Sequence, residues 1–224
     1  MLSFLKAGAA ALAISAALLT APSAAVAQDG GSITVTYKDD IATLDPAIGY
    51  DWQNFSMIKA IFDGLMDYEP GTATLRPGLA ESYEISPDGK VFTFKLRDGV
   101  KFHNGREMTA DDVKYSFERT VNPATQSPGA GFLASIDGFD AMQAGEATSL
   151  SGVEILDPKT VQVTLSRPDA TFLSVMALNF SFIVPKEEVE KSGADFGRNP
   201  VGTGAFKLAE WTLGQKLVLQ KNTD

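Results

Sequence analysis

The stretch of residues 75–120 constrains the fold most, because its local signals all describe one compact unit. Apolar or aromatic residues alternate with polar ones in residues 80–85 and 91–96, which predicts two half-buried strands. The four residues between them, 86–89, read Ser-Pro-Asp-Gly. Proline presets φ and glycine accepts a positive φ, so these residues predict a tight turn and a hairpin.

A helix is predicted to follow this hairpin. Thr109 can accept a hydrogen bond from the backbone N–H of Asp112, and Asp111 and Asp112 place negative charge at the positive end of the helix. Val113 and Phe117 lie four positions apart and give the helix an apolar face. The predicted order is therefore strand, turn, strand, loop and helix.

This stretch also carries a family resemblance. Residues 79–119 resemble the signature segment of the bacterial extracellular solute-binding proteins of the peptide, dipeptide and nickel class (family 5), which serve ABC importers. Four further segments follow the order shown by the family: LDPA at 44–47, IFDGLMDYE at 61–69, the predicted strand pair around residues 157–160, and NPVGTGAFKLAEW at 199–211. The resemblance covers essentially all of the chain after its first 27 residues.

The resemblance implies an α+β fold, namely the first lobe of a periplasmic binding protein-like fold, with mixed sheets and an inserted subdomain. We expect residues 28–68 to form the first part of this lobe, residues 69–198 the inserted subdomain, and residues 199–224 the return segment. Because members of the family run far longer, the sequence is expected to be an N-terminal fragment from which the second lobe is absent.

Residues 1–27 have the three parts of a secretory signal peptide: Lys6, an apolar run over residues 7–19, and Ala-Val-Ala at 25–27. Cleavage is expected before Gln28, and the apolar run is too short for a permanent membrane anchor. Removing Lys6 and no acid changes the formal net charge from -9 to -10. We therefore predict an exported, periplasmic protein whose acidic surface argues against nucleic acid or anionic lipid as partners.

The residue inventory excludes several kinds of chemistry. The chain has no cysteine, which excludes a thiol nucleophile, a disulfide framework and cysteine-based zinc sites. The adjacent carboxylates Asp39 and Asp40 point in different directions on an extended chain, so they predict a solvated loop. We predict no catalytic residue, no cofactor and no metal site.

A secreted hydrolase would have to use His103, the single histidine of the chain. A histidine base needs a nucleophile as its partner, and the chain lacks a G-x-S-x-G elbow. His103 lies between Phe102 and Asn104 in a predicted turn, which favours a structural or surface role over catalysis.

Residues 48–53, called the aromatic loop below, carry the candidate site. They place Tyr50 and Trp52 beside Gly49, between the loop of residues 38–46 and a predicted helix. Two interpretations fit this pattern. The rings can cap the helix and the core, or they can form a platform on which a ligand lies, with neighbouring backbone groups as hydrogen-bonding partners.

The resemblance favours the platform. In peptide-binding members the segment shortly after LDP lies along the ligand and pairs with its backbone, and this segment corresponds to Tyr50, Asp51 and Trp52. The resemblance implies a monomeric substrate-binding component, not an enzyme, that captures di- or oligopeptides in the periplasm and delivers them to an ABC permease. Nickel chelates, sugars and opines are ligands of the same family that the sequence does not separate from peptides.

Three local expectations complete the prediction. Residues 32–37 alternate in polarity in the manner of an edge strand. Gly202 and Gly204 mark a place where the backbone passes close to its neighbour as the chain returns to the first lobe. Gly129 stands where the resemblance places an aromatic residue in oligopeptide-binding members, which argues against a preference for long peptides.

Overall fold

The structure, a computed structural model, describes residues 31–223. The chain divides into two compact units, residues 1–36 and 37–224. The signal peptide predicted at residues 1–27 lies outside the described residues. Among the helices of the described part, none is long and apolar enough to cross a bilayer.

The prediction of an edge strand at residues 32–37 is wrong. These residues carry no helix or strand. A strand exists by virtue of hydrogen bonds to a neighbouring strand, and none of the described strands pairs with this segment. Alternating polarity alone therefore did not suffice to form one.

The largest sheet of the second unit has four strands in the order β3-β4-β6-β5. Its strands are β3 (Ala80–Ile85), β4 (Val91–Leu96), β5 (Val153–Asp157) and β6 (Thr160–Thr164). The first two have the predicted bounds, and Gly89 in the turn between them has the expected positive φ of 70°. Every pairing among the described strands is antiparallel, which corrects the expectation of mixed sheets. Four of the five pairs join strands that follow one another in the chain through short connections, which only antiparallel neighbours allow, and the fifth pair, β4 with β6, is antiparallel across a long connection.

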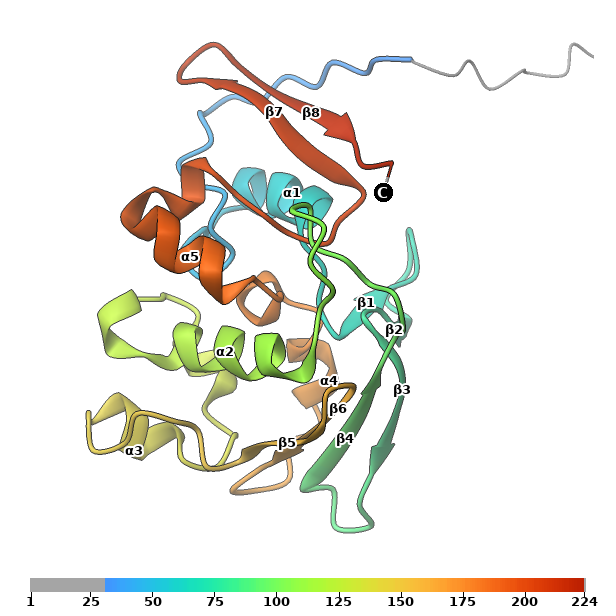
Figure 1. Cartoon of the computed structure of the whole chain (residues 1–224), viewed down its shortest axis with the longest axis vertical. Coiled ribbons are helices and arrows are strands. Elements are labelled where there is room, and N and C mark those ends of the chain that lie inside the picture. The colour runs from blue at the N-terminus through green and yellow to red at the C-terminus, as the bar shows by residue number, and fades with distance from the viewer. Residues whose placement is uncertain (1–30, 224) are drawn as a thin grey trace, which may run out of the picture. The chain divides into compact units, whose positions relative to one another are not determined.

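Helix α2 (Ala110–Val121) packs against this sheet (Figure 1). Val113 and Phe117 are fully buried, as their spacing predicts, in one core with Phe94 and Val163 of the sheet. The remaining short elements around this core are β1 (Met66–Tyr68), β2 (Leu75–Pro77), η1 (Pro123–Thr125), η2 (Ala130–Leu133), α3 (Phe139–Gln143), α4 (Phe172–Val175), η3 (Asn179–Ser181), α5 (Lys186–Ser192) and η4 (Gly193–Arg198).

A second core lies around helix α1 (Trp52–Ile61). It contains Leu44, Ile58 and Phe196, and the hairpin of β7 (Phe206–Thr212) and β8 (Lys216–Lys221) packs against it (Figure 1). Segments from both ends of the sequence therefore share one core. The subdomain boundaries assigned from the sequence stay a prediction.

The return segment crosses the end of α1 at very short range. The N–H of Gly204 donates to the carbonyl of Ile61 at 2.8 Å, which satisfies one of the open carbonyls at the helix end. A Cβ at Gly202 would lie 2.1 Å from the same carbonyl oxygen. The close backbone approach predicted for these glycines is confirmed.

Candidate functional site

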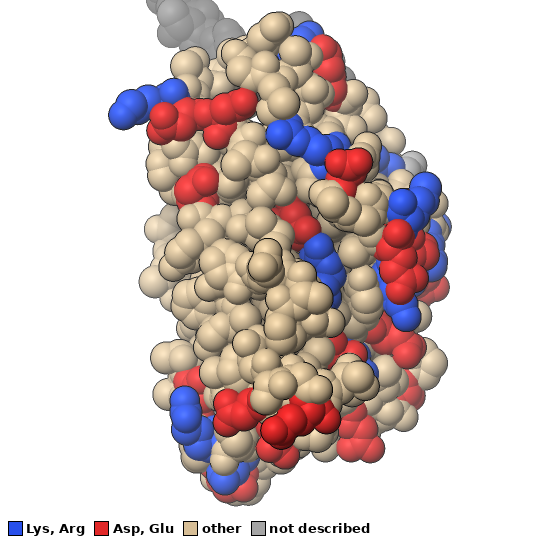
Figure 2. All heavy atoms as spheres, turned by 90° about the vertical axis from the view of Figure 1, so that its left-hand side faces the viewer, with Lys and Arg blue, Asp and Glu red and all other residues tan. Residues whose placement is uncertain are grey.

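The aromatic loop lies on the surface, at the start of α1. Tyr50 is 59% exposed and Trp52 is 63% exposed, so neither ring is a core residue. Figure 2 looks onto the left-hand side of Figure 1 and shows a broad uncharged area at the centre and left of that face, with Lys, Arg, Asp and Glu above, below and to the right of it.

Asp51 is the N-cap of α1. Its backbone is extended, with φ -141° and ψ 165°, and its Oδ1 accepts a hydrogen bond from the backbone N–H of Asn54 at 2.8 Å. Its Oδ2 accepts a second bond from Asn54 Nδ2, also at 2.8 Å. The carboxylate of Asp51 therefore stabilises the first turn of the helix, since it satisfies a donor that the helix leaves open.

The backbone beside this cap is open. Within residues 31–223, the N–H and C=O of Tyr50 and the N–H of Asp51 have no hydrogen-bonding partner, whereas the carbonyl of Asp51 accepts from the N–H of Phe55 at 2.9 Å. An extended segment with a free donor and acceptor at the surface has the chemistry of a strand edge. It can pair with the backbone of another extended chain.

The ring of Phe180 supports this surface from beneath. Phe180 is only 2% exposed, and its ring centroid lies 5.5 Å from that of Tyr50, 6.0 Å from that of Phe55 and 5.6 Å from that of Phe132. A Cβ at Gly129 would lie 2.1 Å from the Phe180 ring, so this ring fills the space beside position 129. Sequence reasoning missed both Phe132 and Phe180, because no periodic pattern links them to the aromatic loop.

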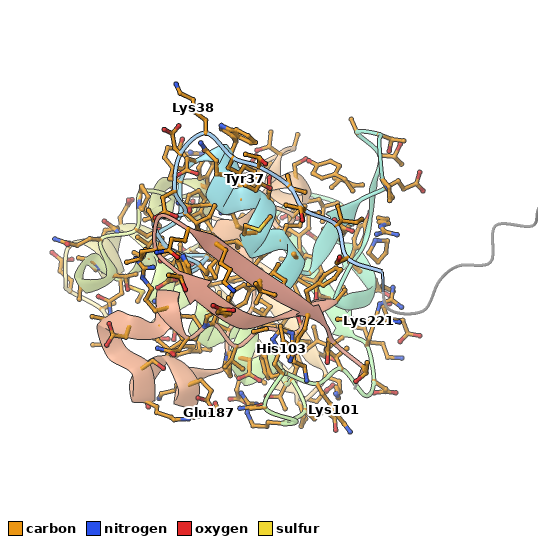
Figure 3. The ribbon with its side chains drawn as sticks, turned by 90° about the horizontal axis from the view of Figure 1, so that it is seen from above. Tyr37, Lys38, Lys101, His103, Glu187 and Lys221 are labelled. Carbon is orange, nitrogen blue, oxygen red and sulfur yellow. The ribbon has the colours of Figure 1, made fainter. Side chains whose placement is uncertain are left out.

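His103 has a structural position. Its Nε2 lies 3.0 Å from the carbonyl oxygen of Gly204, and its Nδ1 accepts from the N–H of Gly202 at 3.3 Å (Figure 3). The backbone N–H of His103 also donates to the carbonyl of Gly202 at 2.8 Å. The histidine thus holds the return segment in place, and this geometry gives no support to a hydrolase centred on it.

A polar hollow of about 500 Å³ lies apart from the aromatic loop. Asp63, Lys59, Arg76 and Lys101 are among its lining residues. Burial raises the pKa of Asp63, and the hydrogen bond from the Thr203 hydroxyl, at 2.8 Å, opposes this effect. Among the described residues no group of three or more histidine or acidic side chains is placed to hold a metal ion.

Comparison with known proteins gives a consistent result. The family model described as "Bacterial extracellular solute-binding proteins, family 5 Middle" matches residues 74–224. The dipeptide-binding protein of Escherichia coli K12 is 38% identical over 171 residues, which are 70% of this chain and 31% of that protein. The periplasmic murein peptide-binding protein MppA of the same organism is 34% identical over 207 residues, which are 90% of this chain and 38% of that protein.

Among solved structures, an oligopeptide ABC transporter substrate-binding domain from Bacillus anthracis superposes with a TM-score of 0.80 at 29% sequence identity. The match covers 84% of this chain and 37% of that structure. The chain therefore spans between about a third and two fifths of these relatives.

Proposed function

Since the chain belongs to the bacterial extracellular solute-binding proteins of family 5, we propose that it captures di- or oligopeptides in the periplasm for an ABC importer. The relatives support this class of ligand, because their names describe binders of dipeptides, murein peptides and oligopeptides. The family is one of binding proteins, so the chemistry required is reversible capture of a ligand.

The observation that carries the proposal is the open backbone of Tyr50, together with the exposed rings of Tyr50 and Trp52. A peptide in extended conformation offers alternating N–H and C=O groups along its whole length. It would pair with the N–H and C=O of Tyr50, while the rings of Tyr50 and Trp52 cover its side chains. Backbone pairing recognises any peptide, and so it suits a carrier that accepts several sequences.

Asp51 takes a different part in this site. Both of its carboxylate oxygens already accept hydrogen bonds from Asn54, so the side chain stays with the helix. The contribution of Asp51 to the ligand is its backbone N–H, which has no partner within residues 31–223. Tyr50 and Asp51 would therefore supply backbone groups for pairing with the peptide, and Tyr50 and Trp52 would supply the rings that cover its side chains.

In the whole protein a second lobe would close over the peptide. Binding would shift the population from open to closed forms, and the permease would recognise the closed form. The first lobe would contribute the edge at Tyr50, and the ligand would be buried from both sides. In that arrangement the exposed rings of Tyr50 and Trp52 would be covered by the bound peptide.

Calorimetry on the protein at its natural length tests the proposal with trialanine and alanyl-phenylalanine as probes. The double variant Tyr50→Ala with Trp52→Ala is expected to weaken binding by about 2 kcal/mol, roughly thirtyfold, because two partly buried contacts are lost. Phe206→Ala on β7 is the control, since this ring is also exposed but lies outside the site. Wild-type protein that binds neither probe would contradict the choice of peptides, and nickel chelates, sugars and opines would be tried next.

A second probe isolates the backbone. A trialanine analogue in which an ester replaces one of the two amides lacks one donor and keeps the side chains. We expect it to bind about tenfold more weakly than the peptide, the cost of one hydrogen bond between exposed strands. Equal affinities would remove strand pairing from the proposal.

A further inference from the structure

Among the described strands none pairs with the aromatic loop, so other contacts must set the path of its backbone. The contacts that do so come from residues far away in the sequence. These contacts converge on Asp45, which lies five residues before Tyr50. The side chain of Asp45 is 9% exposed.

Arg119, in the last turn of α2, holds Asp45 with two guanidinium nitrogens. Its Nη1 donates to Asp45 Oδ1 at 2.8 Å and its Nη2 donates to Asp45 Oδ2 at 2.5 Å. The guanidinium also lies over the ring of Phe196, 5.5 Å from its centroid, and the side chain of Arg119 is only 13% exposed. A planar, two-bonded pair of this kind fixes orientation as well as distance.

Asp45 in turn accepts hydrogen bonds from the backbone of the residues that follow. Its Oδ1 also accepts from the N–H of Ala47 at 3.0 Å, and its carbonyl accepts from the N–H of Ile48 at 3.1 Å and of Gly49 at 2.9 Å. The backbone from Asp45 to Gly49 is thus wound around one anchored residue. Tyr50, with its open N–H and C=O, comes directly after this turn.

A second contact fixes the end of the turn. The carbonyl of Gly49 accepts from Asn179 Nδ2 at 3.2 Å, and this bond is buried. A Cβ at Gly49 would lie 2.6 Å from Ile58 Cδ1, so the turn is pressed against α1. With both ends held, the direction of the Tyr50 backbone groups depends on the position of Asp45.

We propose that Arg119 is a positioning residue for ligand capture: through Asp45 it orients the backbone of Tyr50 so that the free N–H and C=O face the ligand. This inference rests on the function proposed above, in which Tyr50 pairs with a peptide. A buried ion pair contributes little net stability compared with apolar packing of the same volume, whereas it can specify one arrangement of the segments that it joins. Arg119 therefore sets the geometry of a site that it does not touch.

The chain supplies a matched control. Arg106 binds the buried carboxylate of Asp112 in the same way, with Nη1 to Oδ2 at 2.9 Å and Nη2 to Oδ1 at 2.6 Å. This pair lies at the other end of α2 and contacts no residue of the aromatic loop. Arg119→Lys and Arg106→Lys each keep the charge and lose the two-bonded geometry.

The first readout is amide hydrogen exchange in the protein at its natural length, without ligand. Arg119→Lys is expected to speed exchange at the amides of residues 47–49, which donate to Asp45, by about tenfold and to leave residues 109–112 unchanged, because local opening reports lost anchoring. Arg106→Lys is expected to give the reverse pattern. Unchanged exchange over residues 47–49 in Arg119→Lys would overturn the proposal, whatever ligand the protein binds.

The second readout is affinity for trialanine and alanyl-phenylalanine. Arg119→Lys should bind about tenfold more weakly and Arg106→Lys within about twofold of wild type. Asp45→Asn should match Arg119→Lys, and the double variant should be no weaker than either, since the two residues act as one unit. Equal losses in Arg119→Lys and Arg106→Lys would overturn the proposal, because that result describes a general loss of stability.

The two proposals fail in different ways. If the wild-type protein binds neither peptide, the proposed ligand class is wrong and the exchange experiment still decides what Arg119 does. If wild type binds and the variant Arg119→Lys binds equally well, the positioning role is wrong and peptide capture stands.

Discussion

Two arginines near opposite ends of α2 bind buried carboxylates with similar geometry, but the two pairs differ in how far apart their partners lie in the sequence. Arg106 binds Asp112, six residues away, and its side chain is 36% exposed. Arg119 binds Asp45, 74 residues away, and is 13% exposed. The first pair closes a local loop at the start of a helix, and Arg106 also binds the exposed carboxylate of Glu187 in α5. The second pair joins the helix to the segment that carries the aromatic loop. The buried partner is thus local in one place and distant in the sequence in the other.

The largest expected effect concerns the loss of each arginine. Arg119→Ala should lower the free energy of unfolding by about 3–5 kcal/mol, because it leaves the Asp45 carboxylate buried without its partner. Arg106→Ala should cost about 1–2 kcal/mol, because water reaches this guanidinium and can replace part of its contact with Asp112. Urea denaturation of both variants measures the difference. Equal losses in the free energy of unfolding would mean that the sequence separation of the two partners has no bearing on stability.

A smaller effect is expected for the neutral contacts of the two regions. Asn179→Ala removes the buried hydrogen bond to the carbonyl of Gly49 and should cost about 1–2 kcal/mol. Asn104 lies near Arg106, and its amide donates to Glu187 and Glu188 at the surface, so Asn104→Ala should cost less than about 0.5 kcal/mol. Thermal unfolding of both proteins gives the comparison. A larger loss for Asn104→Ala would reverse the ranking of the two regions.

The smallest expected effect is the stability that the Glu187 contact with Arg106 loses at acid pH. Partial burial would raise the pKa of Glu187, but the hydrogen bonds and positive charge that its carboxylate receives, chiefly from Arg106, together outweigh burial and hold this pKa below the ordinary value of 4.5. Because the folded form has the lower pKa, the contribution to stability is present above pH 4.5 and is lost as the pH falls through the folded pKa. The amount is at most about 0.5 kcal/mol, since water screens the exposed pair.

Glu187→Gln should therefore lose slightly less stability than wild type when the pH falls from about 5 to about 3. Urea unfolding at a series of pH values measures this slope. A steeper slope in the variant than in wild type would contradict a lowered pKa of Glu187 in the folded protein. Lys186→Gln is the control, because its charge faces Glu190 across an exposed pair of 3.6 Å.

Sequence reasoning was most successful where the interactions are local. The bounds of β3 and β4, the turn at Gly89 and the buried positions Val113 and Phe117 follow from neighbouring residues alone. It failed at residues 32–37, where polarity alternates but the residues carry no strand. The exposed rings of the aromatic loop fit the platform interpretation, and the site itself stays a proposal.

The sequence by itself determined the family, the α+β class and the three candidate residues Tyr50, Asp51 and Trp52, because motifs and short periodic patterns are written in adjacent positions. Only the tertiary structure decided which of their groups are free. The Asp51 carboxylate accepts hydrogen bonds from Asn54, and the Tyr50 backbone is open within residues 31–223. The turn that precedes Tyr50 is bonded by Arg119 at Asp45 and by Asn179 at Gly49. Such contacts join segments 74 and 130 residues apart, and a linear pattern does not contain them.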